Sequence, residues 1–324
     1  MRVLVTGATS FLGRSLVDRL VDRGDTVSVL QRSPSGLDVT EYLGDIVEQR
    51  TVAKSMEGAE AVVHLAARVA ATGPWAEFEA VNVQGTRNVL GAAQAAGVRC
   101  FVHVSSPSVA YQGKSLVGAP AGPADPNRCK DHYARSKAHA ELVALAGNSS
   151  DMAVVAVRPH LVWGPGDTQL IGRIVDRARD GRLVIVGSGC ALIDTTYIDN
   201  AADALVAALD RAPGLGGRAF VVSNGEPRPV QELLNRIVRC AGLEPPSARV
   251  PYQVARGGGF VAERIWERRG STEDPPMTSF GAEQLGTAHW YDQRETRAAL
   301  GWEPKMKLAE GFEELRAWFE AANG

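Results

Sequence analysis

The chain has 324 residues, of which 45% are hydrophobic and 22% are charged, and its formal net charge is −2. This ordinary globular composition excludes a disordered chain, and the near-neutral charge excludes the basic surface on which nucleic-acid binding depends. No stretch approaches the roughly 18 apolar residues of a membrane span, and residues 1–9 lack the apolar run of a signal peptide, so we expect a soluble, cytoplasmic protein.

The first 160 residues alternate short apolar runs with amphipathic segments. The predicted strands are Arg2–Val5, Thr26–Gln31, Ala61–Leu65, Cys100–Ser105 and Val154–Arg158. The predicted helices between them are Gly13–Arg23, Trp75–Ala96 and Tyr133–Ala146. Apolar strands of this length that alternate with helices indicate a doubly wound α/β (Rossmann) fold, in which helices cover both faces of a parallel sheet.

After residue 160 the pattern changes, and prolines and glycines become frequent. Helices are predicted at 169–180, 199–211, 230–241, 261–268 and 309–321, with strands at 183–186 and 219–223. We expect residues 1–160 with about 195–225 to form the Rossmann domain. About 161–194 and 226–324 would form a smaller, discontinuous C-terminal substrate lobe. The segment 250–290 has the weakest pattern, and we expect it to be a mobile lid.

The four cysteines are too far apart to bind a metal ion together, and they form no Cys-x-x-Cys pair. They are Cys100, Cys129, Cys190 and Cys240. We therefore expect no metal site and no disulfide framework.

A glycine turn follows the first predicted strand, in the segment Gly7-Ala8-Thr9-Ser10-Phe11-Leu12-Gly13. Gly7 permits a sharp turn and Gly13 permits close packing of the helix on the strand, so that free amides at the helix N-terminus can face a pyrophosphate. Ser10 stands where such loops usually have their middle glycine. The segment indicates a dinucleotide site, and a purely structural turn would have the same pattern.

The end of the second predicted strand, Gln31-Arg32-Ser33, bears on which dinucleotide binds. An NAD site usually has Asp or Glu here, whose carboxylate binds the ribose 2′-hydroxyl. Gln31 is neutral, and Arg32 and Ser33 can bind a 2′-phosphate through a charged guanidinium and a hydroxyl. The pattern favours NADP(H) over NAD(H), although Arg32 would look the same as an ordinary surface arginine.

Tyr133 and Lys137 are four residues apart, so on a helix they share one face. An ammonium near a phenol lowers the pKa of the phenol, which makes Tyr133 usable as an acid or base near neutral pH. A serine-rich segment at the end of a strand, residues 105–108, can supply a hydroxyl to the same carbonyl oxygen that Tyr133 protonates. Together these groups indicate an oxidoreductase centre, whereas each motif alone is weak.

In order along the chain, these motifs resemble the extended short-chain dehydrogenase/reductase family. Further matching segments are Gly44-Asp45-Ile46, His64-Leu65-Ala66-Ala67, Asn82-Val83-x-Gly85-Thr86 and Arg158-Pro159. The resemblance implies that Ser106, Tyr133 and Lys137 are the catalytic residues. It implies that the cofactor contacts are Gly7, Thr9, Ser10, Phe11, Leu12, Gly13, Arg32, Ser33, Asp45, Ile46, Leu65, Ala66, Ala67, Tyr133, Lys137, Pro159, Leu161 and Val162.

The second half is similar to the 3β-hydroxysteroid dehydrogenase branch of that family, through residues 159–167, 194–200 and 223–227. Residues 275–278 and 289–291 are similar to the 2-alkyl-3-oxoalkanoate reductases of bacterial olefin biosynthesis. That resemblance implies NADPH-dependent reduction of the 3-keto group of a 2-alkylated fatty acid, a homodimer, and olefin-pathway enzymes as partners. Candidate contacts to this lipid-like substrate are Ser108, His160, Trp163 and Tyr197.

Other functions remain compatible with the sequence. A 3β-hydroxysteroid or sterol-carboxylate dehydrogenase would use the same catalytic residues on a rigid polycycle. A protein that senses NADP(H) without turnover would keep the fold, but the intact Ser106, Tyr133 and Lys137 argue against it. His160 can bind a carboxylate or serve as a structural histidine, and Trp163 and Tyr197 can be core residues.

Overall fold

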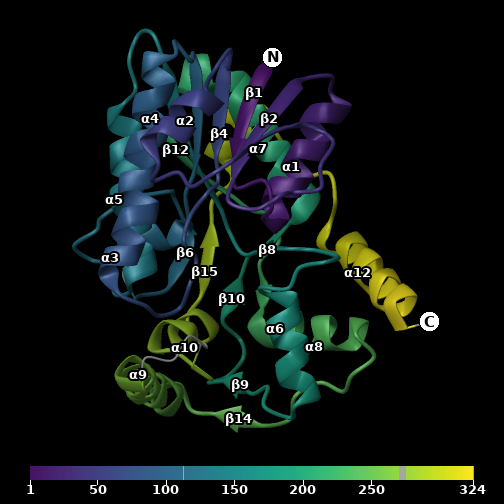
Figure 1. Ribbon diagram of the computed structural model, residues 1–324. Coiled ribbons are helices and arrows are strands. Elements are labelled where there is room, and N and C mark those ends of the chain that lie inside the picture. The colour runs from purple at the N-terminus through teal and green to yellow at the C-terminus, as the bar shows by residue number, and fades with distance from the viewer. Residues whose placement is uncertain (112, 270–274, 324) are drawn as a thin grey trace.

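The computed structural model describes residues 1–111, 113–269 and 275–323, and its largest element is a seven-stranded parallel sheet (Figure 1). The strands lie in the order β12-β7-β5-β4-β1-β2-β3. Their bounds are β1 Arg2–Thr6, β2 Thr26–Gln31, β3 Thr40–Leu43, β4 Ala61–His64, β5 Cys100–Val104, β7 Ala153–Pro159 and β12 Ala219–Val222. The chain begins in the middle of the sheet and extends it in both directions, which confirms the doubly wound prediction.

Helices cover both faces of this sheet. On one face lie α1 (Phe11–Asp22) and α7 (Ile198–Leu215), and on the other α2 (Gln49–Ser55), α4 (Thr86–Ala95) and α5 (His132–Ala146). Side chains of a strand point alternately to the two faces, so Val3 and Val5 pack with α1 and α7, whereas Leu4 packs with α2 and α4. The two resulting apolar layers bury both faces of the parallel sheet.

The predicted long helix Trp75–Ala96 is divided into three parts. A short helix α3 (Trp75–Phe78) leads into a π-helical turn, Glu79–Gly85, and then into α4. Asn82 lies in the π-helical turn, and its amide binds the backbone of Arg68 and donates to the Ser136 Oγ at 2.8 Å. The widened turn thus brings a buried amide against the helix that carries Tyr133, which hydrophobic periodicity alone does not reveal.

The second lobe lies below the sheet in Figure 1. Its helices are α6 (Ile171–Arg179), α8 (Val230–Cys240), α9 (Tyr252–Arg269) and α10 (Ser279–Gly286), with α12 (Leu308–Asn323) packed against α8. Short strands complete it: β8 Val162–Trp163, β9 Ile185–Val186, β10 Leu192–Ile193, β11 Thr196–Tyr197, β13 Arg228–Pro229, β14 Arg249–Val250 and β15 His289–Tyr291. None of the helices among the described residues is both long enough and apolar enough to cross a membrane.

The expected division of the chain between the lobes differs from the structure at two places. Strand β6 (Leu116–Ala119), inside the segment expected to belong to the Rossmann domain, pairs with β15 in a four-stranded sheet of order β13-β10-β15-β6. Helix α11 (Arg294–Leu300), expected in the second lobe, packs against α7 and β12 of the first. The chain therefore crosses between the lobes more often than composition suggests.

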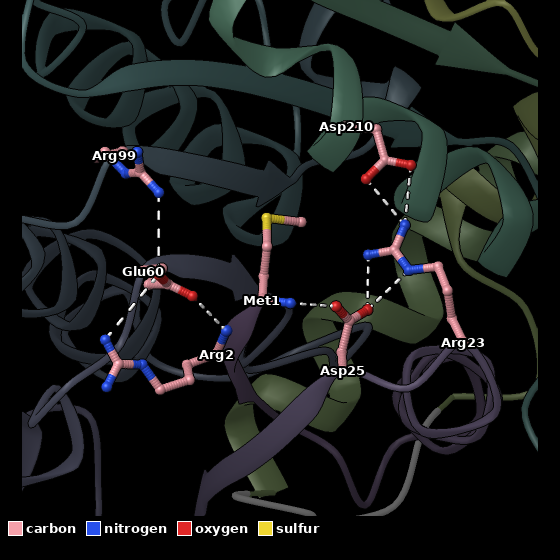
Figure 2. A network of polar contacts seen from close by, with 7 residues as sticks. All are labelled: Met1, Arg2, Arg23, Asp25, Glu60, Arg99 and Asp210. Carbon is pink, nitrogen blue, oxygen red and sulfur yellow. Dashed lines mark hydrogen bonds and ion pairs between the residues drawn. The ribbon is translucent and has the colours of Figure 1, made fainter.

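Ion pairs join three segments at the amino-terminal edge of the sheet (Figure 2). The amino group of Met1 lies 2.7 Å from Asp25, and Arg23 lies 2.7 Å from Asp25 and 2.8 Å from Asp210 on α7. Exposed pairs of this kind contribute about 0–1 kcal/mol each. They join segments at the edge where the strands begin, whereas parallel α/β sheets bind ligands at the opposite edge, where the strands end.

A buried ion pair ties β7 to α5. Arg158 donates to both carboxylate oxygens of Glu141, at 2.8 and 2.5 Å, and both side chains are fully buried. The same guanidinium donates to the backbone oxygens of Ala121 and Gly122, at 2.5 and 3.0 Å. One arginine therefore joins a strand, a helix and the segment that leads to that helix.

We predict that Arg158→Met destabilises the fold by about 3–5 kcal/mol, because it leaves the Glu141 carboxylate buried without its partner. The double variant Arg158→Met/Glu141→Met should recover most of this loss, since no unpaired charge remains. Urea unfolding of both variants measures the free energies. A single variant within 1 kcal/mol of the wild type would contradict the assigned role of the pair.

Acid should destabilise the fold through His64, which bridges β1 and α4 through Thr6 at 2.7 Å and Thr86 at 3.0 Å. Burial, with a smaller contribution from Lys137, lowers the pKa of His64 from 6.5 to about 3. The folded pKa is depressed, so this stability is present above pH 6.5 and is lost as the pH falls toward 3; the loss by pH 4.5 is about 2–3 kcal/mol. Urea unfolding of His64→Gln should show a smaller loss on acidification, whereas a variant of the exposed His132 should behave like the wild type.

Candidate active site

A cavity of about 290 Å³ lies at the carboxyl ends of β5 and β7, between the sheet and the second lobe. Both lobes contribute to its wall. Its lining residues are Ser106, Pro107, Ser108, Tyr111, Tyr133, Pro159, His160, Leu161, Phe280, Gln284, His289 and Tyr291. Parallel α/β sheets bind ligands at this edge, so the cavity is where the topology predicts chemistry.

Two hydroxyl groups meet in this cavity. Tyr133 stands in the first turn of α5, whose N-terminus is capped by the Asp131 side chain through the amide of Ala134 at 2.7 Å. Ser106 follows β5 and caps the short 3-10 turn Pro107–Ala110, and its Oγ lies 2.9 Å from the Oγ of Ser108. The structure therefore brings the predicted Ser106, Ser108 and Tyr133 together.

Tyr133 is protonated at neutral pH in this structure. Burial raises the pKa of Tyr133 to about 12, the hydrogen bond with the Ser106 hydroxyl opposes the rise, and the Asp131 carboxylate adds to it. The protonated form is the one that a proton donor to a ketone oxygen requires.

Lys137 lies one turn further along α5 and is almost completely buried. Its Nζ donates to the backbone oxygen of Val104 at 2.6 Å, and burial lowers the pKa of Lys137 to about 8, partly opposed by Glu141. The expectation that this ammonium lowers the pKa of Tyr133 differs from this structure, in which burial raises that pKa and the ammonium donates to a carbonyl of β5. The shared helix face was predicted, but this carbonyl partner was not.

A second cavity, of about 400 Å³, opens at the ends of β1, β2 and β4. Among the predicted cofactor residues it is lined by Gly7, Thr9, Ser10, Arg32, Asp45, Ile46, Leu65, Ala66 and Ala67. Gly7 has φ +79°, and a Cβ there would lie 2.8 Å from the amide nitrogen of Ala66. A side chain at this position would therefore obstruct the second cavity. Ser10 caps α1 through the amide of Gly13 at 3.1 Å, which orients the helix terminus that is suited to a diphosphate. The residues present therefore fit a dinucleotide.

The remaining predicted cofactor contacts lie elsewhere in the structure. Pro159 and Leu161 line the cavity of Tyr133, and Phe11, Leu12 and Val162 pack against the apolar core of the second lobe. Gly13 is buried within α1, and Ser33 is exposed beside the cavity rather than in its lining. Residues that sequence reasoning missed also line the cavity, among them Arg68 and Val81.

Gln31 lines this second cavity, and Glu41 lies against Gln31 on the neighbouring strand. The carboxylate of Glu41, on the edge strand β3, accepts hydrogen bonds from the Gln31 amide and from the backbone of Ser35 at 2.8 Å. These hydrogen bonds, that of Ser35 above all, lower the pKa of Glu41. Arg32 lines the cavity, and its guanidinium takes part in none of the ion pairs found among the described residues. Sequence reasoning missed Glu41 because β3 is short and half-exposed.

The four predicted substrate residues separate into two groups. Ser108 and His160 line the cavity of Tyr133. Trp163 and Tyr197 are buried in the core of the second lobe, where their rings pack edge to face at 5.4 Å and the Trp163 indole donates to Thr195 at 3.0 Å. Neither lines that cavity, because β8 and β11 pair with each other and direct both side chains into the core.

The second lobe supplies the cavity residues that the sequence did not single out. Phe280 and Gln284 are four residues apart on α10, and His289 and Tyr291 alternate on β15. The spacing of these residues can be read from the sequence. The pairing of β15 with β6, which brings them to the site, cannot be read from it. A further apolar cavity of about 60 Å³ shares Leu161 with this site and includes Trp163, Leu170 and Ile193 in its wall.

Known proteins resemble the chain over its whole length. Residues 4–252 match the family model described as the 3-beta hydroxysteroid dehydrogenase/isomerase family. A 2-alkyl-3-oxoalkanoate reductase of Stenotrophomonas maltophilia is 39% identical, with 98% of this chain and 99% of that protein covered. A protein of the same name from Shewanella oneidensis is 36% identical over 97% of this chain and 85% of its own length. The solved structure of MoeE5 in complex with UDP-glucose and NAD covers both chains completely, with 25% identity and a TM-score of 0.77.

Proposed function

The chain belongs to the 3-beta hydroxysteroid dehydrogenase/isomerase family and is a keto/hydroxy oxidoreductase, and on this premise we propose that it reduces the 3-keto group of a 2-alkyl-3-oxoalkanoic acid with NADPH. The observation that carries the proposal is the convergence of Ser106 and Tyr133 on one cavity whose other wall is the second lobe. The names of the full-length relatives supply the substrate class.

The proposed reaction places the ketone oxygen between two hydroxyl groups. A bound nicotinamide supplies the hydride for C3. Tyr133 donates its phenolic proton to the developing alkoxide, and the Ser106 hydroxyl donates a hydrogen bond to the same oxygen. Lys137 holds the end of β5 through the Val104 carbonyl at 2.6 Å. In the reverse direction the phenolate of Tyr133 takes the proton from the alcohol.

NADP(H) is the proposed cofactor because of the charges near Gln31. Arg32 lines the cavity and is exposed, so its guanidinium can bind a 2′-phosphate. The Glu41 carboxylate is engaged by the Gln31 amide and the backbone of Ser35, and Glu41 does not belong to the cavity lining. Tyr133 and Lys137 would hold the nicotinamide half, and Pro159, Leu161 and Val162 would border it.

The alkyl chains would extend toward the second lobe. Phe280, Leu161 and Tyr111 give the cavity of Tyr133 apolar walls, and the small apolar cavity behind Leu161 continues in the same direction. A rigid 3β-hydroxysteroid or sterol carboxylate is the second candidate substrate, favoured by the description of the matching family. Flexible alkyl chains and a rigid polycycle require cavities of different shape, so activity measurements with both substrates distinguish the two candidates.

The assembly and location of the protein are also proposals. We propose a cytoplasmic homodimer that contacts other enzymes of olefin biosynthesis. Helices α4 and α5 would form the dimer interface, since Leu142 on α5 is 45% exposed and leaves an apolar side chain on that surface.

The direct test follows NADP⁺ reduction with a racemic 2-alkyl-3-hydroxyalkanoic acid, beside a 3β-hydroxysteroid and beside NAD⁺. The oxidative direction avoids the unstable β-keto acid. We expect NADP⁺-dependent turnover of the hydroxy acid. Turnover of the steroid alone would replace the proposed substrate by the second candidate.

Tyr133→Phe should lower kcat in this assay by at least about 100-fold while cofactor binding is retained, because the variant lacks the proton-transfer group but keeps the ring. Tyr111→Phe is the matched control, since it removes a hydroxyl from the same cavity that bonds Thr287 at 2.9 Å. Equal losses in both variants would assign proton transfer to another group.

Arg32→Ala should raise KM for NADP⁺ by about 10- to 100-fold, as expected for the loss of a hydrogen-bonded charge worth about 1.5–3 kcal/mol, and should leave KM for NAD⁺ nearly unchanged. Arg50→Ala, which removes another exposed arginine, from α2, is the control for net charge. A parallel rise for both cofactors would reject 2′-phosphate binding by Arg32.

A further inference from the structure

Two histidines from different lobes meet in the wall of the cavity that holds Tyr133. His160 follows β7, His289 begins β15, and the His289 Nδ1 lies 3.0 Å from the His160 Nε2. Both side chains are buried, at 5% and 1% exposure, and both line the cavity together with Ser106 and Tyr133. The mechanism above uses neither of them.

The hydrogen bonds determine which nitrogens of the neutral pair carry protons. The His289 Nε2 lies 2.8 Å from the backbone oxygen of Gln284, which can only accept, so this nitrogen carries a proton. The His289 Nδ1 is then an acceptor, and the His160 Nε2 must donate to it. The His160 Nδ1 is left with a lone pair, and this buried atom has no hydrogen-bond partner among the described residues.

The unpartnered nitrogen is a site for one additional proton. Burial lowers the pKa of both histidines, and His289 further opposes the charging of His160, so the pair is neutral at pH 7. The backbone of Asp194 favours the protonated form of His160 and so partly opposes the effect of burial. An anion beside the pair would favour the charged form in the same way.

The residues that line the cavity include no lysine and no arginine. The charged groups nearby are already paired: Arg158 binds Glu141, and Glu283 on α10 accepts from Lys130 at 2.6 Å and from Arg256 at 3.0 Å. The Asp194 carboxylate accepts from Ser223 and from the amides of Gly225 and Glu226. The phenols of Tyr111, Tyr133 and Tyr291 also face the cavity, and burial raises the pKa of each, so they are neutral.

We propose that His160 and His289 together form the carboxylate-binding site of the substrate and take up one proton from solution when the acid binds. This inference rests on the proposed function, because a 3-oxo acid carries its carboxylate two bonds from the ketone carbon. Such a group must enter the cavity with the ketone. Without the proton the carboxylate would be buried beside neutral rings, whereas with it an imidazolium provides the counter-charge.

The proposal also assigns a basis for selectivity. An ester or an alcohol has no charge for the imidazolium to bind, so it gains nothing from the proton that the pair takes up. Acids should therefore bind more tightly as the pH falls from 8 toward 6, and neutral analogues should not.

The test is calorimetric titration of the protein, with NADPH present, using a 2-alkyl-3-hydroxyalkanoic acid and its methyl ester. NADPH cannot oxidise the hydroxy acid, so binding is measured without turnover. Titration in two buffers of different ionisation enthalpy gives the number of protons taken up. We expect about one proton for the acid near pH 7.5 and none for the ester.

His160→Gln keeps a donor toward His289 but cannot hold the proton. It should weaken binding of the acid at least tenfold, abolish proton uptake and leave the ester unaffected. His289→Gln should have the same selective effect, while Phe280→Leu, in the same wall, should change both ligands alike. Should the variants fail to fold, proton uptake by the wild type alone decides the question.

Binding of the acid without proton uptake, or equal weakening of acid and ester by His160→Gln, would overturn the proposal. Failure of the proposed function gives a different result. Proton uptake on binding an acid that is never oxidised with NADP⁺ would keep the carboxylate site and reject the reductase assignment.

Discussion

The buried pair of Arg158 and Glu141 is the interaction on which the arrangement of the site depends. Arg158 is the penultimate residue of β7, and Glu141 lies one turn beyond Lys137 on α5, so the pair fixes the helix that carries Tyr133 against the sheet. The guanidinium also binds the carbonyls of Ala121 and Gly122, in the segment that leads toward α5. A buried ion pair contributes little net stability, but it specifies one geometry, and here that geometry is the position of the phenol.

The two cavities follow from the same sheet edge. Strands β1 and β2 end at the cavity lined by Gly7 and Arg32, and β5 and β7 end at the cavity lined by Ser106 and His160. Parallel strands place all their carboxyl ends at one edge, so a dinucleotide laid across this edge reaches from one cavity to the other. Burial raises the pKa of the Tyr133 phenol, and the second lobe supplies the other wall of its cavity.

The sequence predicted the parts of the protein that depend on local patterns. Apolar strands, the glycine turn of Gly7 and the one-turn spacing of Tyr133 and Lys137 are short-range signals, and the structure brings these segments together. The carbonyl partner of Lys137, the π-helical turn at Asn82 and the contact of Glu41 with Gln31 depend on neighbours distant in the chain. The hydrophobic periodicity of the sequence does not predict these long-range contacts. The cavity wall of the second lobe was missed for the same reason.

The second lobe is interleaved with the first, because strand β6, the stretch from β8 to β11 and the stretch from β13 to β15 reach it on separate passages of the chain. No single cut releases it, and no single insertion could replace it with the lobe of another protein. This protein therefore cannot acquire a new substrate by exchanging the whole second lobe. Divergence must proceed by individual replacements in a wall whose residues lie on several passages, so relatives that differ in substrate are expected to retain the same chain path throughout.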